Sequence, residues 1–230
     1  MFFTKLNIFT VALLTSCSCL GRPQTDVPSR ILGLFVTYSK SHMLVYCTVA
    51  EHLARVGHNV TVIGIIENVY PNANYKYLHL QLPKGDRLDN NALRRVINRR
   101  HSFIQSLIVT TREYMRMANA SLWQPEMREF LRDRRAGAYD LLLFGYVMNE
   151  FQMGLAAHFQ CPIVVLWVVQ PALQVNRFVG NSVEPNYVPT LTSRLQQPLN
   201  FMGRLKNYIN ALLEELLVLY LDYCAGQLYM

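Results

Sequence analysis

Two apolar runs of strand length, separated by a helical pattern, constrain the fold of this chain more than any other feature. Residues 31–36 and 60–66 are almost continuously apolar, which is typical of strands that are covered on both faces of a parallel sheet. Between them, apolar residues recur with helical spacing from a polar loop at Ser39 to Gly57, a residue type common at helix C-termini. Strand, helix and strand within about 36 residues form a βαβ unit. The first strand is therefore predicted to lie in the centre of a parallel sheet.

The same pattern recurs farther along the chain. Residues 139–145 and 162–167 have the composition of buried strands, and a helix is expected between them at about 150–159. The alternating residues 77–82 predict one more strand, nearer the edge of the sheet. The fold class is predicted to be α/β, with a Rossmann-like, doubly wound parallel sheet. Of the 230 residues, 51% are hydrophobic and 16% charged, which excludes a disordered chain.

Most of the net positive charge lies in one stretch. Residues 84–135 carry twelve basic and six acidic side chains, which is +6 of the total of +7. The four arginines between 94 and 100 do not fall on one face of a helix. We interpret them as a solvated surface and expect no nucleic-acid partner. The stretch is predicted to be helical, with breaks near Asn119 and Pro125.

The last third of the chain combines a loop and a helix. Residues 171–198 contain four of the ten prolines and are predicted to form a long ordered loop. Residues 203–223 then show the spacing of one amphipathic helix. Glu214 and Glu215 interrupt its apolar residues, so we expect no transmembrane span in this chain.

The first 21 residues predict a secretory signal peptide. One basic residue, an apolar stretch at 6–14 and several small residues follow in that order. The domain at 22–230 is therefore expected in the secretory pathway, in the lumen of the endoplasmic reticulum. Sequons at Asn119 and Asn59 predict a glycoprotein. Asn119 is favoured, because Asn59 is expected to open a buried strand.

Cysteine usage indicates free thiols and no metal site. Removal of the signal peptide leaves Cys47, Cys161 and Cys224, and three cysteines cannot all pair within one chain. Their spacing from histidines matches no metal-binding motif, so no metal is expected.

One histidine lies where the fold is predicted to place a ligand. In an open parallel sheet, ligands bind outside the carboxyl ends of the strands. His42 is six residues past Val36, at the amino end of the first predicted helix. It is a candidate base, whereas the alternative is a solvated or capping histidine.

Several stretches resemble one enzyme family. "SKSH" after the first strand and "LARVGHNVTVI" at the end of the βαβ unit are similar to the amino-terminal half of animal UDP-glycosyltransferases, especially insect members of the UDP-glucuronosyltransferase family. "YDLLLFGYVMNEFQMGLAAHFQCPIVV", "NSVEPNYVP" and "FMGRLKNYINAL" agree in the same order. The resemblance runs from about Arg30 to the end of the chain.

The resemblance implies the acceptor-binding half of a GT-B glycosyltransferase, which transfers a glucuronosyl or glucosyl group from a UDP-sugar to a small lipophilic acceptor. It implies no cofactor, since the UDP-sugar is a co-substrate. Nothing in the chain resembles the donor-binding signature of the family or its membrane anchor, so we expect a truncated domain, incomplete at its C-terminus and inactive alone. The alternative is a non-catalytic paralogue that binds lipophilic ligands or associates with full-length family members.

The resemblance also implies roles for single residues. His42 matches the general base of the family, which removes the proton of the acceptor hydroxyl. The partner acid of that histidine falls at Gly145, where glycine supplies no carboxylate. Glu150 is the nearest downstream carboxylate and a candidate substitute, whereas Asp140 begins its strand and is expected at the opposite edge of the sheet. Candidate residues for an apolar acceptor pocket, any of which could equally belong to the core, are Tyr38, Met43, Phe103, Trp123 and Phe151.

Overall fold

A computed structural model of the chain describes residues 27–83, 103–169, 173–182, 184–190, 193 and 195–228. The predicted signal peptide and the arginines between 94 and 100 lie outside the described residues. The chain divides into two compact units. The first is described over residues 27–83, 120–147 and 152–166. The second comprises residues 103–119, 148–151 and the described part of 167–228.

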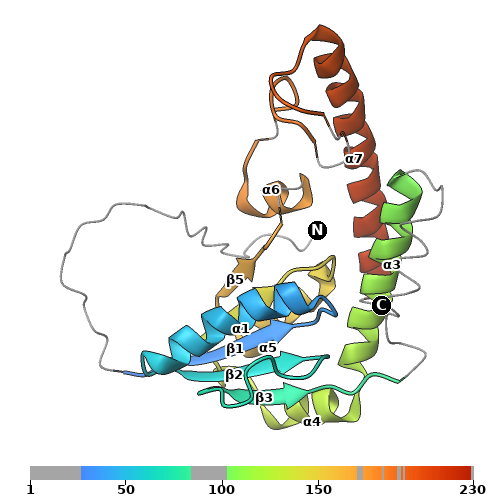
Figure 1. Ribbon diagram of the computed structural model, residues 1–230. Coiled ribbons are helices and arrows are strands. Elements are labelled where there is room, and N and C mark those ends of the chain that lie inside the picture. The colour runs from blue at the N-terminus through green and yellow to red at the C-terminus, as the bar shows by residue number, and fades with distance from the viewer. Residues whose placement is uncertain are drawn as a thin grey trace, which may run out of the picture. The chain divides into compact units, whose positions relative to one another are not determined.

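The first unit contains one parallel sheet of five strands in the order β3-β2-β1-β4-β5 (Figure 1). Leu34 of β1 pairs with Ile63 of β2 on one side and with Phe144 of β4 on the other. The predicted α/β class, the central first strand and the edge position of the third strand are confirmed. The strands are β1 (Arg30–Phe35), β2 (Asn59–Gly64), β3 (Lys76–His79), β4 (Leu141–Gly145) and β5 (Ile163–Leu166).

Helix α1 (Lys40–Arg55) connects β1 to β2 and lies across the sheet (Figure 1). The Ser39 hydroxyl caps its amino end by accepting a hydrogen bond from the backbone N–H of His42, at 3.5 Å. At its carboxyl end Gly57 has φ of 103°, a left-handed conformation that glycine adopts without a steric penalty. The apolar stripe of α1, including Met43, Tyr46 and Cys47, is fully buried.

The other helices correct two predictions. Asn119 lies within a continuous helix, so no break occurs there, whereas the predicted break at Pro125 is confirmed. Gln124 is extended, as the residue before a proline prefers, and Pro125 starts the next helix, where its missing N–H costs no hydrogen bond. A short helix also forms inside the predicted loop at 171–198. These helices are α3 (Phe103–Leu122), α4 (Pro125–Asp133), η1 (Glu150–Met153), α5 (Gly154–Phe159), α6 (Leu173–Val179) and α7 (Phe201–Gln227).

Aromatic rings form much of the core of the first unit. Phe35 of β1 packs on Tyr46 of α1, with ring centroids 5.1 Å apart. Tyr139 packs on Phe130 of α4 and Phe159 of α5, with ring centroids 6.1 and 5.2 Å apart.

Among the described helices, none is long and apolar enough to cross a membrane.

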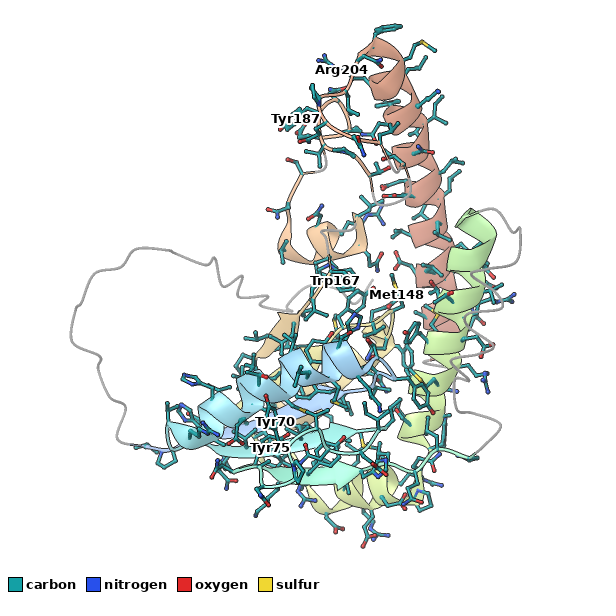
Figure 2. All side chains as sticks on the ribbon, viewed as in Figure 1. Tyr70, Tyr75, Met148, Trp167, Tyr187 and Arg204 are labelled. Atoms are coloured by element: carbon teal, nitrogen blue, oxygen red, sulfur yellow. The ribbon has the colours of Figure 1, made fainter. Side chains whose placement is uncertain are left out.

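A buried carboxylate of α1 forms hydrogen bonds with the segment that joins β2 to β3. Glu51 is 6% exposed and accepts hydrogen bonds from the backbone N–H and the side-chain amide of Asn74, and from Arg55. The bond from the backbone of Asn74 is the largest cause that lowers the pKa of Glu51 below its ordinary value. Tyr70 and Tyr75 lie in the same segment (Figure 2), and the Tyr70 and Thr48 hydroxyls are 2.8 Å apart.

We predict that Glu51→Gln destabilises the protein at neutral pH and removes part of its acid sensitivity. Because the folded state lowers the pKa of Glu51, the ionised carboxylate stabilises the fold fully above the unfolded-state pKa of about 4.3. This stabilisation is lost as the pH falls through the lower pKa of the folded state. The free energy of unfolding, measured with urea between pH 7 and pH 3, should therefore become similar for the variant and the unmodified chain at acidic pH. Glu67→Gln, at an exposed glutamate, is the control. A difference in the free energy of unfolding between the unmodified chain and Glu51→Gln that stays the same from pH 7 to pH 3 would contradict the prediction.

Candidate functional site

The turn between β1 and α1 holds the predicted base at the carboxyl edge of the sheet. The backbone of this turn is fixed by its own hydroxyl groups, since the buried Thr37 accepts a hydrogen bond from the N–H of Ser39 at 3.1 Å. Ser39 in turn caps α1 through His42. His42 therefore occupies the first turn of the helix, where it is half-buried. Its ring centroid lies 6.3 Å from that of Tyr46.

The His42 imidazole has no carboxylate partner among the described residues. Its Nδ1 atom is buried and makes no hydrogen bond within this part of the chain. Burial alone lowers the pKa of His42 below its ordinary value of 6.5, because a less polar surrounding disfavours the charged form. The imidazole is thus neutral at neutral pH and chemically able to accept a proton.

Gly145 ends β4 close to this turn, and an aromatic ring fills the space where its side chain would project. A Cβ atom at residue 145 would lie 2.8 Å from Cε2 of Tyr46 and 3.1 Å from Cδ1 of Phe35. Tyr46 is fully buried, and its hydroxyl donates to the backbone carbonyl of Tyr146 at 3.4 Å. Sequence reasoning identified the glycine but missed Tyr46. The available signal was its spacing of four residues from His42, which places both on one side of α1.

Only part of the predicted acceptor pocket lies near His42. Tyr38 is half-buried in the same turn. Met43 is fully buried, and its Cε atom lies 2.8 Å from the position of a Cβ atom at Gly64, so it belongs to the core. Trp123 is 64% exposed and lies under the Arg128 guanidinium of α4, 5.7 Å from the ring centroid.

The remaining predicted residues lie in or next to the second unit. Phe151 is buried in η1. Glu150 begins the same short helix. Phe103 is the first residue of α3, and its side chain lies outside the described residues. The proposed roles of Phe103, Glu150 and Phe151 stay predictions.

The opposite, amino edge of the sheet carries charged groups. Asp140 precedes β4 and accepts hydrogen bonds from the backbone and guanidinium of Arg30, at 2.7 Å in each case. The bond from the Arg30 side chain is the main cause that lowers the pKa of Asp140 to about 2. A hollow of about 740 Å³ opens at this edge between the strand starts and α4. Asp140 is therefore held at the edge away from His42, as predicted from the sequence.

The two sequons differ in their surroundings. Asn119 is half-buried inside α3, and the hydroxyl of its partner Ser121 is fully buried and accepts a hydrogen bond from Gln152 at 3.0 Å. Asn59 opens β2, as predicted, but its side chain is exposed. The exposure of Asn59 was not predicted, because the burial of a strand residue depends on its place relative to the sheet edge.

The three cysteines form no disulfide bond among the described residues. Cys47, Cys161 and Cys224 are free thiols, and burial is the main cause that raises the pKa of Cys47. Over the described ranges, no group of three or more histidine, cysteine, aspartate or glutamate side chains is arranged to hold a metal ion.

Comparison with known proteins identifies the family. The family model described as "UDP-glucoronosyl and UDP-glucosyl transferase" matches residues 32–230. The chain belongs to this family. With the parallel sheet described above, this makes the first unit part of the amino-terminal, Rossmann-like half of a GT-B glycosyltransferase.

Individual relatives of the chain are distant. The chain is 24% identical over 186 residues to UDP-glucosyltransferase 2 of Dactylopius coccus, a match that covers 80% of this chain and 35% of the relative. The chain thus spans about a third of the length of that curated relative.

Solved glycosyltransferase structures also match part of the chain. The glycotransferase of kitacinnamycin has a TM-score of 0.41 at 18% identity, with 66% of this chain and 34% of that chain covered. CalG4, the calicheamicin glycosyltransferase, has a TM-score of 0.31 at 17% identity, with 70% and 38% covered. LpCGTa in complex with UDP has a TM-score of 0.39 at 13% identity, with 79% and 43% covered.

We predict that Gly145→Ala lowers the free energy of unfolding by about 1–3 kcal/mol, because the added methyl group overpacks the contact with Tyr46 and Phe35. In a Tyr46→Leu background the same change should cost clearly less, since the aromatic ring is absent and the two changes are coupled. Chemical unfolding of the four proteins measures this coupling.

Gly226→Ala is the matched control, since a Cβ atom there meets no atom within 4 Å; it should leave stability unchanged or raise it slightly. Equal costs of Gly145→Ala in both backgrounds would contradict the assignment of the space to Tyr46.

Proposed function

We propose that this chain is the acceptor-binding half of a UDP-sugar-dependent glycosyltransferase, and that its acceptor is a small lipophilic molecule with a hydroxyl group. The observation that carries the proposal is the neutral, half-buried imidazole of His42 at the carboxyl edge of the sheet. Ligands of open α/β folds bind at this edge. The charged amino edge, with the Arg30–Asp140 ion pair, offers no such base.

We assign His42 the role of general base. In the proposed reaction the acceptor O–H donates its proton to Nε2 of His42. The acceptor oxygen then forms a bond to the anomeric carbon of the sugar as the bond from that carbon to the UDP oxygen breaks. A base that is neutral at the working pH typically contributes about 10²–10⁴ in rate to such a step.

The surroundings of Nδ1 support the proposal that the chain is inactive alone. For Nε2 to accept a proton, the single hydrogen of the neutral imidazole must reside on Nδ1. That N–H would be buried without an acceptor among the described residues, which disfavours this tautomer by about 1–3 kcal/mol. The donor sugar would have to be bound by another part of a longer protein or by a full-length family member.

The contact between Gly145 and Tyr46 favours a second candidate, a non-catalytic relative that binds lipophilic ligands or associates with full-length family members. The ring of Tyr46 fills the space next to the place where the family resemblance implies an acid. A carboxylate at residue 145 would therefore require a different residue at 46. Both candidates bind the acceptor, but only the first takes part in the transfer of a sugar to it.

Acceptor binding is expected to depend on pH through His42. The pKa of His42 is lowered from 6.5, so the neutral imidazole accepts a hydrogen bond from a phenol at pH 7.5 and loses this ability as the pH falls through that lowered pKa. Titration calorimetry with 1-naphthol should show about 3- to 10-fold weaker binding at pH 5 than at pH 7.5, the loss of one hydrogen bond. His42→Phe should bind with the same affinity at both pH values, and His58→Phe is the control.

Transfer is tested separately. The purified chain, incubated with UDP-glucose or UDP-glucuronate and phenolic acceptors, should form no glycoside by mass spectrometry. Glycoside that disappears with His42→Ala would refute the proposed inactivity of the chain alone. Absence of saturable acceptor binding in calorimetry would refute acceptor binding in both candidates.

We also propose that residues 1–21 direct the chain into the secretory pathway and that Asn59, the more exposed sequon, carries a glycan. Expression in insect cells should give a product whose gel mobility increases on treatment with peptide N-glycosidase. Asn59→Gln should abolish this shift and Asn119→Gln should keep it, whereas the reverse pattern would favour Asn119. A product that never shifts would argue against glycosylation at either sequon.

A further inference from the structure

The hollow at the amino edge of the sheet has no role in the proposed sugar transfer. Its volume of about 740 Å³ lies within the range of about 300–1,000 Å³ that is typical of small-molecule sites. All of its lining residues belong to the first unit. They come from the starts of β1, β2 and β3, from α4 and from the turn that precedes β4. The hollow is therefore a second candidate site, at the edge of the sheet away from His42.

One of the two sequons opens into this hollow. Side chains alternate between the two faces of a strand, and Gly64 of β2 faces α1, because a Cβ atom there would lie 2.8 Å from Cε of Met43. Asn59 and Thr61 therefore project from the other face of β2, and both line the hollow together with residues of α4. Figure 1 shows α1 and α4 on opposite sides of the sheet.

The backbone of Asn59 is held in place by the sheet. Its N–H donates a hydrogen bond to the carbonyl of Ser29 at 2.9 Å, and the residue pairs with Arg30 of β1. A group attached to the side-chain amide of Asn59 would therefore start from a fixed point at the boundary of the hollow. Such pre-organisation lowers the entropy that is lost when the attached group packs against the protein.

The walls of the hollow combine apolar and polar groups. Phe130 and Tyr139 are 5% and 7% exposed, and Leu78 and Ala138 are half-buried. The more exposed lining side chains are mostly charged. Apolar surface with polar groups around it is typical of ligand sites. It suits a sugar ring, whose C–H face packs on apolar side chains while its hydroxyl groups form hydrogen bonds.

The charges that line the hollow cancel, which favours a neutral occupant. With no net charge, the hollow has no electrostatic preference for a phosphate group or for a cation. Its cationic groups donate hydrogen bonds and its carboxylates accept them, and hydroxyl and acetamide groups do both. The basic residues are Arg30, Lys76 and Arg134, and the acidic residues are Glu126, Glu129 and Asp133.

We propose that the hollow holds the inner sugars of a glycan on Asn59. The inference rests on the proposed glycosylation of Asn59. In that modification the amide nitrogen loses a proton and forms a bond to the anomeric carbon of an N-acetylglucosamine, as the bond from that carbon to a lipid diphosphate breaks. The tether places the sugar beside the hollow at an effective concentration of about 1 mM or more, so contacts too weak to bind a free sugar suffice.

The rate at which the glycan is released from the folded chain tests the packing. Peptide N-glycosidase must reach the bond between Asn59 and the first sugar, which sugars packed in the hollow would shield. The full chain, expressed in insect cells, should release this glycan at least about tenfold more slowly than the glycopeptide obtained from it by proteolysis. Mass spectrometry of the peptide with residue 59 measures release, because the enzyme leaves an aspartate there.

Variants of the lining residues assign this protection to the hollow. Ala138→Trp fills the space, so the folded variant should release the glycan about 3- to 10-fold faster than the unmodified chain. Lys76→Ala and Glu129→Ala should each have an effect in the same direction, since each removes about one hydrogen bond to the sugars. Ala136→Trp, at an exposed position of the same turn, and Glu67→Ala are the matched controls and should release it like the unmodified chain.

The possible results separate this inference from the glycosylation on which it rests. A glycopeptide with no sugar at residue 59 would reject the glycosylation, and with it the inference. A glycan that leaves the folded chain as fast as the glycopeptide would reject the packing alone.

Equal release from Ala138→Trp and the unmodified chain, both folded by circular dichroism, would show that the hollow does not protect the glycan. If Ala138→Trp does not fold, the two alanine variants at exposed positions decide. Release from both at the rate of the unmodified chain would then reject the inference.

Discussion

The packing of one aromatic ring, that of Tyr46, determines the arrangement of the carboxyl edge of the sheet. The ring lies between α1 and the ends of β1 and β4, where it contacts Phe35 and the backbone of Gly145. Because protein interiors are close-packed, the ring and a side chain at residue 145 exclude each other. The glycine at residue 145, the orientation of α1 and the uncharged surroundings of His42 therefore all depend on the position of this ring.

Charged side chains lie at the amino edge of the sheet, whereas the neutral imidazole lies at the carboxyl edge. At the amino edge, Arg30 and Asp140 neutralise each other through two close hydrogen bonds, and the pKa of the carboxylate is lowered accordingly. At the carboxyl edge, the described surroundings of His42 contain an aromatic ring and hydroxyl groups, and the imidazole is kept neutral by burial alone. A base without a fixed counter-charge depends on what binds next to it, so ligand and donor would have a larger influence on His42 than in a site with a built-in carboxylate.

The sequence predicted the features that depend on local patterns. Continuous apolar runs identified β1, β2, β4 and β5, and the cap residues located both ends of α1, because these signals act over a few residues. The sequence did not predict contacts between distant segments. Tyr46 and Gly145 are 99 positions apart. An apolar side chain does not reveal whether it lines a pocket or fills a core, which is why both alternatives were open for Met43. A helix break was expected near Asn119, but the buried Ala118 and Ser121 on either side of it show that tertiary packing outweighs a helix-propensity difference below about 1 kcal/mol.

Helix α7 buries polar and apolar side chains together, since Asn207 and Glu214 are buried along with Val218, Leu221 and Ala225. Its buried Asn207 is tolerated because the carbonyl and amide groups of that side chain are hydrogen-bonded to the segment at 185–190, which satisfies polar groups that burial would otherwise penalise. Such bonds fix the position of a helix but contribute little net free energy, whereas apolar burial contributes about 25 cal/mol for each Å² removed from water. The burial of Val218, Leu221 and Ala225 therefore stabilises α7 by apolar contact, whereas the hydrogen bonds of Asn207 determine where the helix lies.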